Sequence, residues 1–174
     1  MKKSKTVLVA AALLVLSSEI FAGEPGTAVT KPYASLWGAD SQVKKKSYHL
    51  IGSPKEMDEV WSRHRGNIDF EYNGRPEVDF DRCLVVAIFQ GESANTAGIE
   101  CTGILEGATS LTFRFRNRWY QTAVTAKRAS AYGFFVIPRT RKPIVIEEDV
   151  HQGIGQPPIW KERIRLEPKP GIGG

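Results

Sequence analysis

The sequence predicts an α+β domain made mainly of antiparallel β-sheet, or a small open barrel, with one capped helix ahead of most of its strands. Three observations predict this fold class. One segment has helical periodicity and a well-specified start, several short runs have the apolar pattern of strands, and turn-forming residues separate these runs at close spacing. Strands that follow one another without long crossovers are typical of antiparallel sheets.

The first 22 residues have the three parts of a cleavable secretory signal. Lys2, Lys3 and Lys5 precede an apolar run from Val7 to Leu16, and Ala22 stands before the expected cut. The apolar run is about half as long as the ~20 residues that a membrane-spanning helix needs, so we expect no membrane anchor after cleavage. The sequence therefore predicts a periplasmic or secreted protein.

Removal of residues 1–22 would leave 152 of the 174 residues, the size of one domain. We expect residues 23–46, rich in Gly, Pro, Ala, Thr and Ser, to form a flexible arm, residues 47–166 one β-rich domain, and residues 167–174 a disordered tail. The mature charge of +3, from 21 basic and 18 acidic residues, is too small to indicate a nucleic-acid partner.

A helix is expected from about Ser53 to Arg65. Ser53 supplies the N-cap, Pro54 suits the first turn, and Glu56 completes a capping box. Residues spaced three and four apart form its apolar face: Met57, Val60, Trp61 and His64. This face predicts packing of the helix against a sheet.

The strands are expected in seven short runs. Their bounds are 47–51, 83–89, 98–105, 111–115, 132–137, 144–146 and 160–166. The run 83–89 is apolar on both faces, which is typical of a central strand covered on two sides. We expect it to form an antiparallel hairpin with the run 98–105.

The two cysteines, Cys83 and Cys101, belong to these two expected strands, and two registers of the hairpin are open. If Gln90 faces Gly98, the sulfurs lie roughly 13 Å apart along the strand, too far for a bond. If Phe89 instead faces Asn95 around a five-residue loop, Cys83 and Cys101 lie directly opposite each other on the two strands. A disulfide, which would stabilise by about 3 kcal/mol, and two small buried thiols are the alternatives.

The segment Gly91-Glu92-Ser93-Ala94-Asn95 is one glycine short of a nucleophile elbow. An elbow leads into a helix, whereas residues 96–102 continue with a strand-like pattern, so Ser93 is expected in a hairpin loop. The sequence also lacks the H-E-x-x-H, C-x-x-C, P-loop and S-x-x-K patterns. We therefore predict no catalytic residue and no cofactor.

Glu147, Asp149 and His151 are the candidate metal ligands. An extended backbone would direct alternate side chains to one side, where carboxylates and imidazole could bind a divalent ion. The alternative is a solvated strand end. Because no second histidine or cysteine stands at ligand spacing, we expect no metal centre.

Arg114, Arg116 and Arg118 alternate with Phe113 and Phe115. The phenylalanines are expected to face the core and the guanidinium groups to face outward, where they could bind carboxylates or sulfates of a partner. The alternative is a sheet whose outer face is simply solvated.

Three segments carry a resemblance to a known family. They are the helix with its tryptophan (Ser53 to His64), residues 78–81 leading into Val85–Gly91, and Tyr132 to Pro138. From about Ser53 to Arg139 the chain resembles the PrcB C-terminal domain. The resemblance implies a small exported β-rich domain that assists a secreted protease, and it implies no catalytic residues.

Together these observations predict an exported, non-catalytic binding or accessory module whose partner is another envelope or secreted protein. The resemblance implies a protease as that partner. Two alternatives are an exported hydrolase or metal-dependent enzyme using Glu147, Asp149 and His151, and a structural part of the cell envelope.

Overall fold

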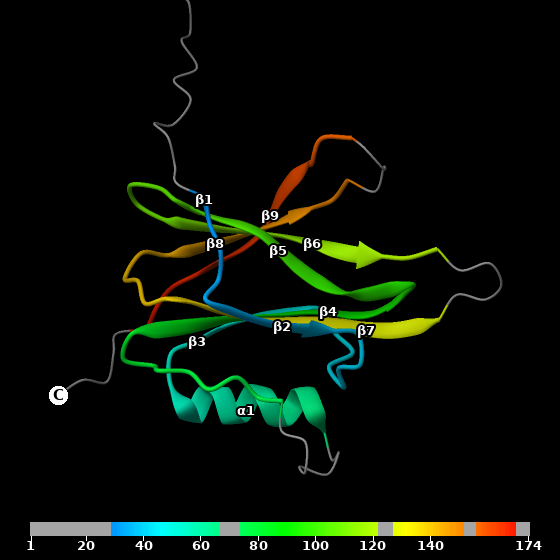
Figure 1. Ribbon diagram of the computed structural model, residues 1–174, viewed down its shortest axis with the longest axis horizontal. Coiled ribbons are helices and arrows are strands. Elements are labelled where there is room, and N and C mark those ends of the chain that lie inside the picture. The colour runs from blue at the N-terminus through cyan, green and yellow to red at the C-terminus, as the bar shows by residue number, and fades with distance from the viewer. Residues whose placement is uncertain (1–28, 67–73, 122–126, 152–155, 170–174) are drawn as a thin grey trace, which may run out of the picture.

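The computed structural model describes residues 29–66, 74–121, 127–151 and 156–169, and arranges them in three layers (Figure 1). Sheet A contains, in spatial order, β1 (Val29–Thr30), β5 (Thr96–Glu106), β6 (Leu111–Trp119), β8 (Ile144–Asp149) and β9 (Trp160–Leu166). Sheet B contains β2 (Ala34–Gly38), β7 (Arg128–Pro138), β4 (Cys83–Ala94) and β3 (Ser47–Ile51). Helix α1 (Pro54–Arg65) covers the outer face of sheet B.

This architecture confirms the predicted fold class. Every pairing between neighbouring strands is antiparallel except that of β6 with β8, which is parallel. The two sheets do not close into a barrel, because the described strands form two separate hydrogen-bonded sheets.

Helix α1 begins where its sequence predicts, although the Glu56 carboxylate bonds Gly52 and not the N-cap residue Ser53 as in a full capping box. The Ser53 hydroxyl accepts the Glu56 N–H at 3.3 Å, and the Glu56 carboxylate accepts the Gly52 N–H at 2.8 Å. The two bonds satisfy backbone donors that have no partner inside the helix. The residues of the predicted apolar face are all buried: Met57, Val60, Trp61 and His64.

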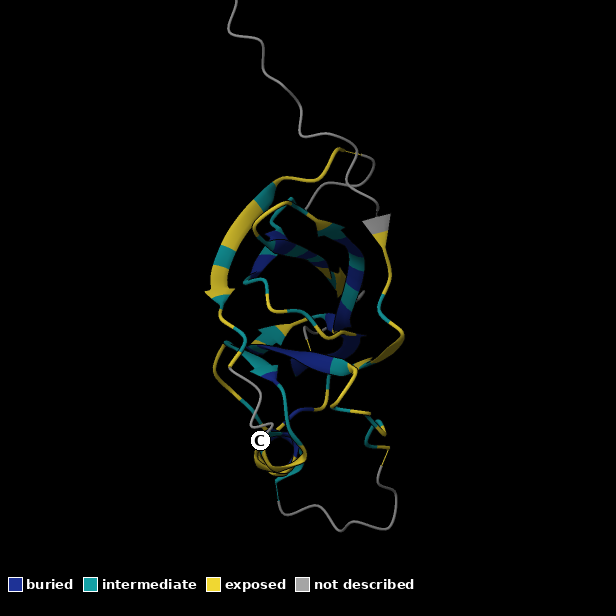
Figure 2. Ribbon diagram, turned by 90° about the vertical axis from the view of Figure 1, so that its left-hand side faces the viewer, coloured by how far each residue is buried: buried dark blue, intermediate teal, exposed yellow. Residues whose placement is uncertain are grey.

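Sheet B lies between two apolar cores because β4 alternates between them. Leu84, Val86 and Ile88 face sheet A. The residues between and after them, Val85, Ala87 and Phe89, face α1. Figure 2 shows the dark blue, buried segments of the sheets turned toward the middle of the molecule. The strand is covered on both faces, as its continuous apolar run predicts.

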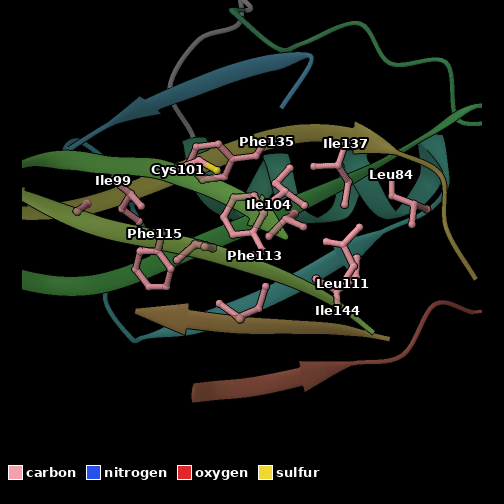
Figure 3. Packing of buried hydrophobic residues seen from close by; sticks show 14 residues of the cluster. Leu84, Ile99, Cys101, Ile104, Leu111, Phe113, Phe115, Phe135, Ile137 and Ile144 are labelled. Carbon is pink, nitrogen blue, oxygen red and sulfur yellow. The ribbon is translucent and has the colours of Figure 1, made fainter. Parts of the chain in front are cut away.

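The core between the sheets contains side chains from five strands (Figure 3). Leu84 of β4, Ile99 of β5, Phe113 of β6, Phe135 of β7 and Ile144 of β8 belong to one buried cluster. Their contacts hold the two sheets face to face, and burial of this apolar surface is the main stabilising term.

The expected hairpin between β4 and β5 does not form. Asn95, at a φ of 55°, joins the strands at a corner where the chain leaves sheet B and enters sheet A. Its N–H donates to the Lys127 carbonyl at 3.0 Å, and its carbonyl accepts the Tyr120 N–H at 3.0 Å. β4 therefore pairs with β3 and β7, and β5 pairs with β1 and β6.

Both cysteine registers are consequently wrong, and both thiols are free. Cys83 packs at the margin of the core under α1, whereas Cys101 is buried between the sheets. Because the two side chains lie in different cores, on opposite sides of sheet B, their sulfurs do not approach to bonding distance.

The flexible arm expected over residues 23–46 is wrong for residues 29–46. β1 pairs with β5 and β2 pairs with β7, so residues 29–38 pass from the edge of sheet A to the edge of sheet B (Figure 1). The Tyr33 N–H donates to the Val136 carbonyl at 2.8 Å, and Leu36 packs against the core under α1. The folded unit therefore begins before residue 47, and the predicted signal peptide lies outside the described residues.

At the other end, residues 167–169 of the expected tail return to the helix. Lys169 forms an ion pair with Glu56, and Arg165 lies 3.5 Å from Glu167. The rest of that expected tail, 170–174, lies outside the described residues. In the described part of the chain, no helix has both the length and the apolar character needed to span a bilayer.

Candidate functional site

The three candidate metal ligands do not form a ligand set. The Glu147 carboxylate accepts a hydrogen bond from Arg114 Nε at 2.7 Å. Asp149 Oδ1 accepts the backbone N–H groups of His151 at 2.9 Å and Ile159 at 3.0 Å. Among the described residues, no group of three or more His, Cys, Asp or Glu side chains is placed to hold a metal ion.

The three arginines of β6 project from the outer face of sheet A, since the alternating phenylalanines are buried in the core. Arg114 pairs with Glu147 at 2.7 Å, and Arg116 pairs with Glu100 at 3.0 Å. Arg118 differs because its guanidinium lies 4.7 Å from the ring centroid of Trp37, an exposed aromatic side chain. All three guanidinium groups thus have partners within the chain.

A buried carboxylate that the sequence interpretation missed joins both sheets. Glu148, which is 5% exposed, accepts hydrogen bonds at Oε1 from Gln90 Nε2 at 2.9 Å and Asn117 Nδ2 at 2.8 Å. Its Oε2 accepts from Arg163 Nε at 2.6 Å and Lys46 Nζ at 3.3 Å. We call these five residues the Glu148 cluster. Its four donors occupy the hydrogen-bonding capacity of the carboxylate, which indicates a structural role.

Two β-bulges aim donors at Glu148. Gln90 stands where the register of β4 against β7 shifts, and Arg163 stands where the register of β9 against β8 shifts. A bulge inserts one unpaired residue and redirects its side chain. Nearby, burial and then the charge of Glu148 raise the pKa of Tyr48 to about 12, so this hydroxyl stays protonated.

The alternation of core-facing and outward-facing residues in β8 is the sequence pattern from which a buried Glu148 could have been predicted. Glu148 is in phase with Ile144 and Ile146, which face the core, whereas the candidate ligands occupy the other phase. A glutamate on the buried face of a strand requires donors inside the protein. The bulges that supply two of them are products of strand pairing.

A serine and a histidine meet beneath the surface at the C-terminal end of α1. Ser41 Oγ lies 3.0 Å from His64 Nδ1, and each residue is 1% exposed. Burial, together with the charge of Arg65, lowers the pKa of His64 to about 4. Ser41 Oγ also accepts the Val43 N–H at 3.1 Å. These contacts anchor the segment before β3 to the C-terminal end of α1.

Ser93, the serine of the incomplete elbow, lies within β4 and pairs with Ala129 of β7. The predicted hairpin loop around it is therefore wrong, because β4 continues as a strand to Ala94. The strand-to-helix turn of a nucleophile elbow is also not formed there.

Above Ser41 an open hollow of about 480 Å³ lies where β4 ends and β7 begins. Residues 39–42 and Lys44 form one side, and residues in or next to the ends of β4, β5, β6 and β7 complete it: Glu92, Thr96, Tyr120 and 127–130. We call this hollow the β4–β7 groove. Its lining combines charged side chains with the buried hydroxyls of Ser41 and Ser130.

Exposed aromatic side chains adjoin the groove. Trp37, Trp119 and Tyr120 are 37%, 49% and 37% exposed, and we call these three residues the aromatic rim. Trp119 pairs with Thr96, and Tyr120 is itself part of the lining. The Trp37 ring rests on Gly98, where a Cβ would approach it to 2.7 Å. Because Gly98 has no side chain, the Trp37 ring can pack directly against its backbone.

Comparison of the chain with protein-family models, with curated proteins and with solved structures found no match. The function is therefore inferred from the residues of this chain and their geometry.

Proposed function

We propose that this protein is an exported, non-catalytic binding module whose partner is another envelope or secreted protein. The observation that carries the proposal is the aromatic rim beside the β4–β7 groove. Tryptophan, tyrosine and arginine are enriched at the hot spots of protein interfaces. Here Trp37, Trp119, Tyr120 and Arg118 lie on neighbouring strand ends.

Contacts within the chain order Trp37 of the aromatic rim in the absence of a partner. Gly98 supports one face of Trp37, and the guanidinium of Arg118 lies over its ring at 4.7 Å. Side chains ordered in advance lose less conformational entropy on binding, which increases affinity for the same contact area.

The groups that could perform chemistry are committed to the fold. Ser41 and His64 are buried and bonded to each other at the groove, and the Glu148 carboxylate is occupied by four donors. The lysine-rich and apolar segments of residues 1–22 support export. The resemblance to the PrcB C-terminal domain makes a secreted protease the partner class to examine first.

The test is capture of envelope proteins by the immobilised chain without residues 1–22. We expect the double substitution Trp37→Ala with Trp119→Ala to reduce recovery of the partner at least about tenfold, since hot-spot truncations cost about 2 kcal/mol each. Tyr33→Ala is the matched control because Tyr33 is 70% exposed at the opposite end of β2. Circular dichroism checks that each variant keeps its fold.

Equal recovery by the double variant and by the wild type would exclude the rim as the binding surface. If no envelope protein is enriched over blank resin, the binding function itself is excluded.

A further inference from the structure

We infer that the β4–β7 groove is an anion-binding subsite that receives a carboxylate-rich segment of the partner protein. The inference deepens the proposed function and rests on it. It depends on how the charges that line the groove are paired within the chain.

Both carboxylates of the groove already have cationic partners. Glu92 accepts a hydrogen bond from Arg128 at 2.9 Å, and Asp40 lies 3.8 Å from Arg65. Within each pair the positive charge offsets the negative charge. The two carboxylates therefore add no net negative charge to the groove.

Two lysines of the groove have no carboxylate partner among the described residues. Lys44 Nζ donates to the Ser41 carbonyl at 3.2 Å and to Ser130 Oγ at 3.3 Å, both of them neutral acceptors. An ammonium group has three N–H donors, so one donor of Lys44 stays available to a ligand. Its two bonds also hold the charge at the floor of the groove.

Lys127 supplies the second charge, on the opposite side. Its backbone is fixed by Asn95, whose Oδ1 accepts the Lys127 N–H at 3.2 Å and whose N–H donates to the Lys127 carbonyl at 3.0 Å. Lys127 is one of the residues that line the groove. The corner that moves the chain between sheets therefore also positions this cation.

The arginines of β6 are a weaker site for an anion. Arg114 and Arg116 each pair with a glutamate of a neighbouring strand, so an incoming carboxylate would compete with a carboxylate already present. At Lys44 an incoming carboxylate would compete only with a hydroxyl and a carbonyl acceptor. Charge complementarity therefore favours binding at Lys44 and Lys127.

The shape of the groove favours a peptide segment over an enclosed small molecule. Its volume of about 480 Å³ suits a few side chains, it is open to solvent, and the aromatic rim continues from its margin. Acidic side chains would contact the two lysines while apolar neighbours pack on the rim. The occupant is thus an acidic segment that also carries apolar residues.

The experiment measures binding of a short fluorescein-labelled peptide of alternating glutamate and leucine to the chain without residues 1–22. Fluorescence anisotropy should show binding that weakens when the ionic strength rises from about 0.05 M to about 0.5 M, because salt screens exposed charges. The double substitution Lys44→Gln with Lys127→Gln should weaken it about tenfold or more.

Lys55→Gln with Lys161→Gln is the matched control. It removes the same charge from exposed lysines of α1 and β9 and should leave the affinity within about twofold. Lys127→Gln alone, which keeps the bonds of Lys44 to the fold, should weaken binding without lowering the thermal midpoint.

Three results would overturn the inference: no binding of the acidic peptide, equal weakening in the groove and control variants, or equal binding of a glutamine–leucine peptide. A sulfated polysaccharide that binds in the same groove while the peptide does not would also overturn it. Each of these leaves the rim-dependent capture of a partner protein untouched. The two proposals can therefore fail separately.

Discussion

His64 is buried among aromatic rings, and its environment disfavours the charged imidazole. Its ring centroid lies 4.1 Å from that of Tyr132 and 5.1 Å from that of Trp61. Burial and the charge of Arg65 lower its pKa from 6.5 to about 4, although Asp40 acts in the opposite direction. The neutral ring is therefore the form that the fold accommodates.

This pKa predicts a loss of stability in acid. Between pH 6.5 and about 4 the unfolded chain binds a proton that the folded chain does not, so stability is complete above this window and falls as the pH decreases through it. The loss is on the order of 3 kcal/mol. Urea denaturation at a series of pH values measures it.

The substitution His64→Phe should remove most of this slope, whatever its effect on stability at neutral pH. The control His49→Gln should retain the part due to His64, because His49 belongs to β3. An unchanged slope in His64→Phe would show that other groups cause the acid sensitivity.

At the scale of elements, the bulge in β4 depends on one glycine. Gly91 has a φ of 73°, in the left-handed region, and it follows Gln90 at the register shift. A Cβ there would lie 2.8 Å from the Lys44 carbonyl and 3.0 Å from the Lys46 N. The bulge therefore allows the chain before β3 to lie against β4, and it positions two members of the Glu148 cluster.

Gly91→Ala is expected to lower the free energy of unfolding by about 2 kcal/mol or more, since it combines a strained backbone with a backbone clash. Gly52→Ala is the control, because the new Cβ would meet its nearest neighbour, Leu84, at an ordinary 3.5 Å. That change should stay within about 1 kcal/mol. Similar losses in both variants would argue against a special role for the bulge.

At the scale of the whole molecule, the Glu148 cluster connects the two sheets. Gln90 belongs to sheet B, and Asn117, Arg163 and Glu148 belong to sheet A. Lys46 comes from the segment that leads into β3. The apolar core holds the sheets together without directional bonds, whereas this cluster sets their relative position.

Glu148→Gln should reduce the free energy of unfolding by about 2–4 kcal/mol, because it removes the buried carboxylate that is the counter-ion of the partly exposed Arg163 and Lys46. The neighbouring Glu147→Gln is the matched control. Its pair with Arg114 is 21–30% exposed, and its loss should cost less than about 1 kcal/mol. Equal losses in the two variants would contradict a structural role for the cluster.

Elements defined by local pattern were predictable. The N-cap Ser53 and the proline after it determine the start of α1, and the bounds predicted for β3 and β9, residues 47–51 and 160–166, are those observed. The apolar run of 83–89 marks the central strand correctly. These features depend on residues that lie next to one another in the chain, so period and capping chemistry suffice.

Neither the corner that follows β4 nor the β4–β7 groove could be predicted from local sequence patterns. A corner at Asn95 and a hairpin loop have similar residues, and the choice depends on pairings with β6 and β7 that lie 25 or more positions away. Likewise, Lys44, Glu92, Tyr120 and Lys127 share a surface only because two sheets end there.

By itself, the sequence determined the fold class, the helix and its buried face, and seven of the nine strands that the structure describes, because hydrophobic periodicity acts over a few residues. Only the tertiary structure decided which strands pair, that β1 and β2 join the sheets, that the thiols stay apart, and that Glu148, the groove and the aromatic rim exist. Those outcomes depend on strand register, bulges and sheet packing, which couple residues far apart in the chain.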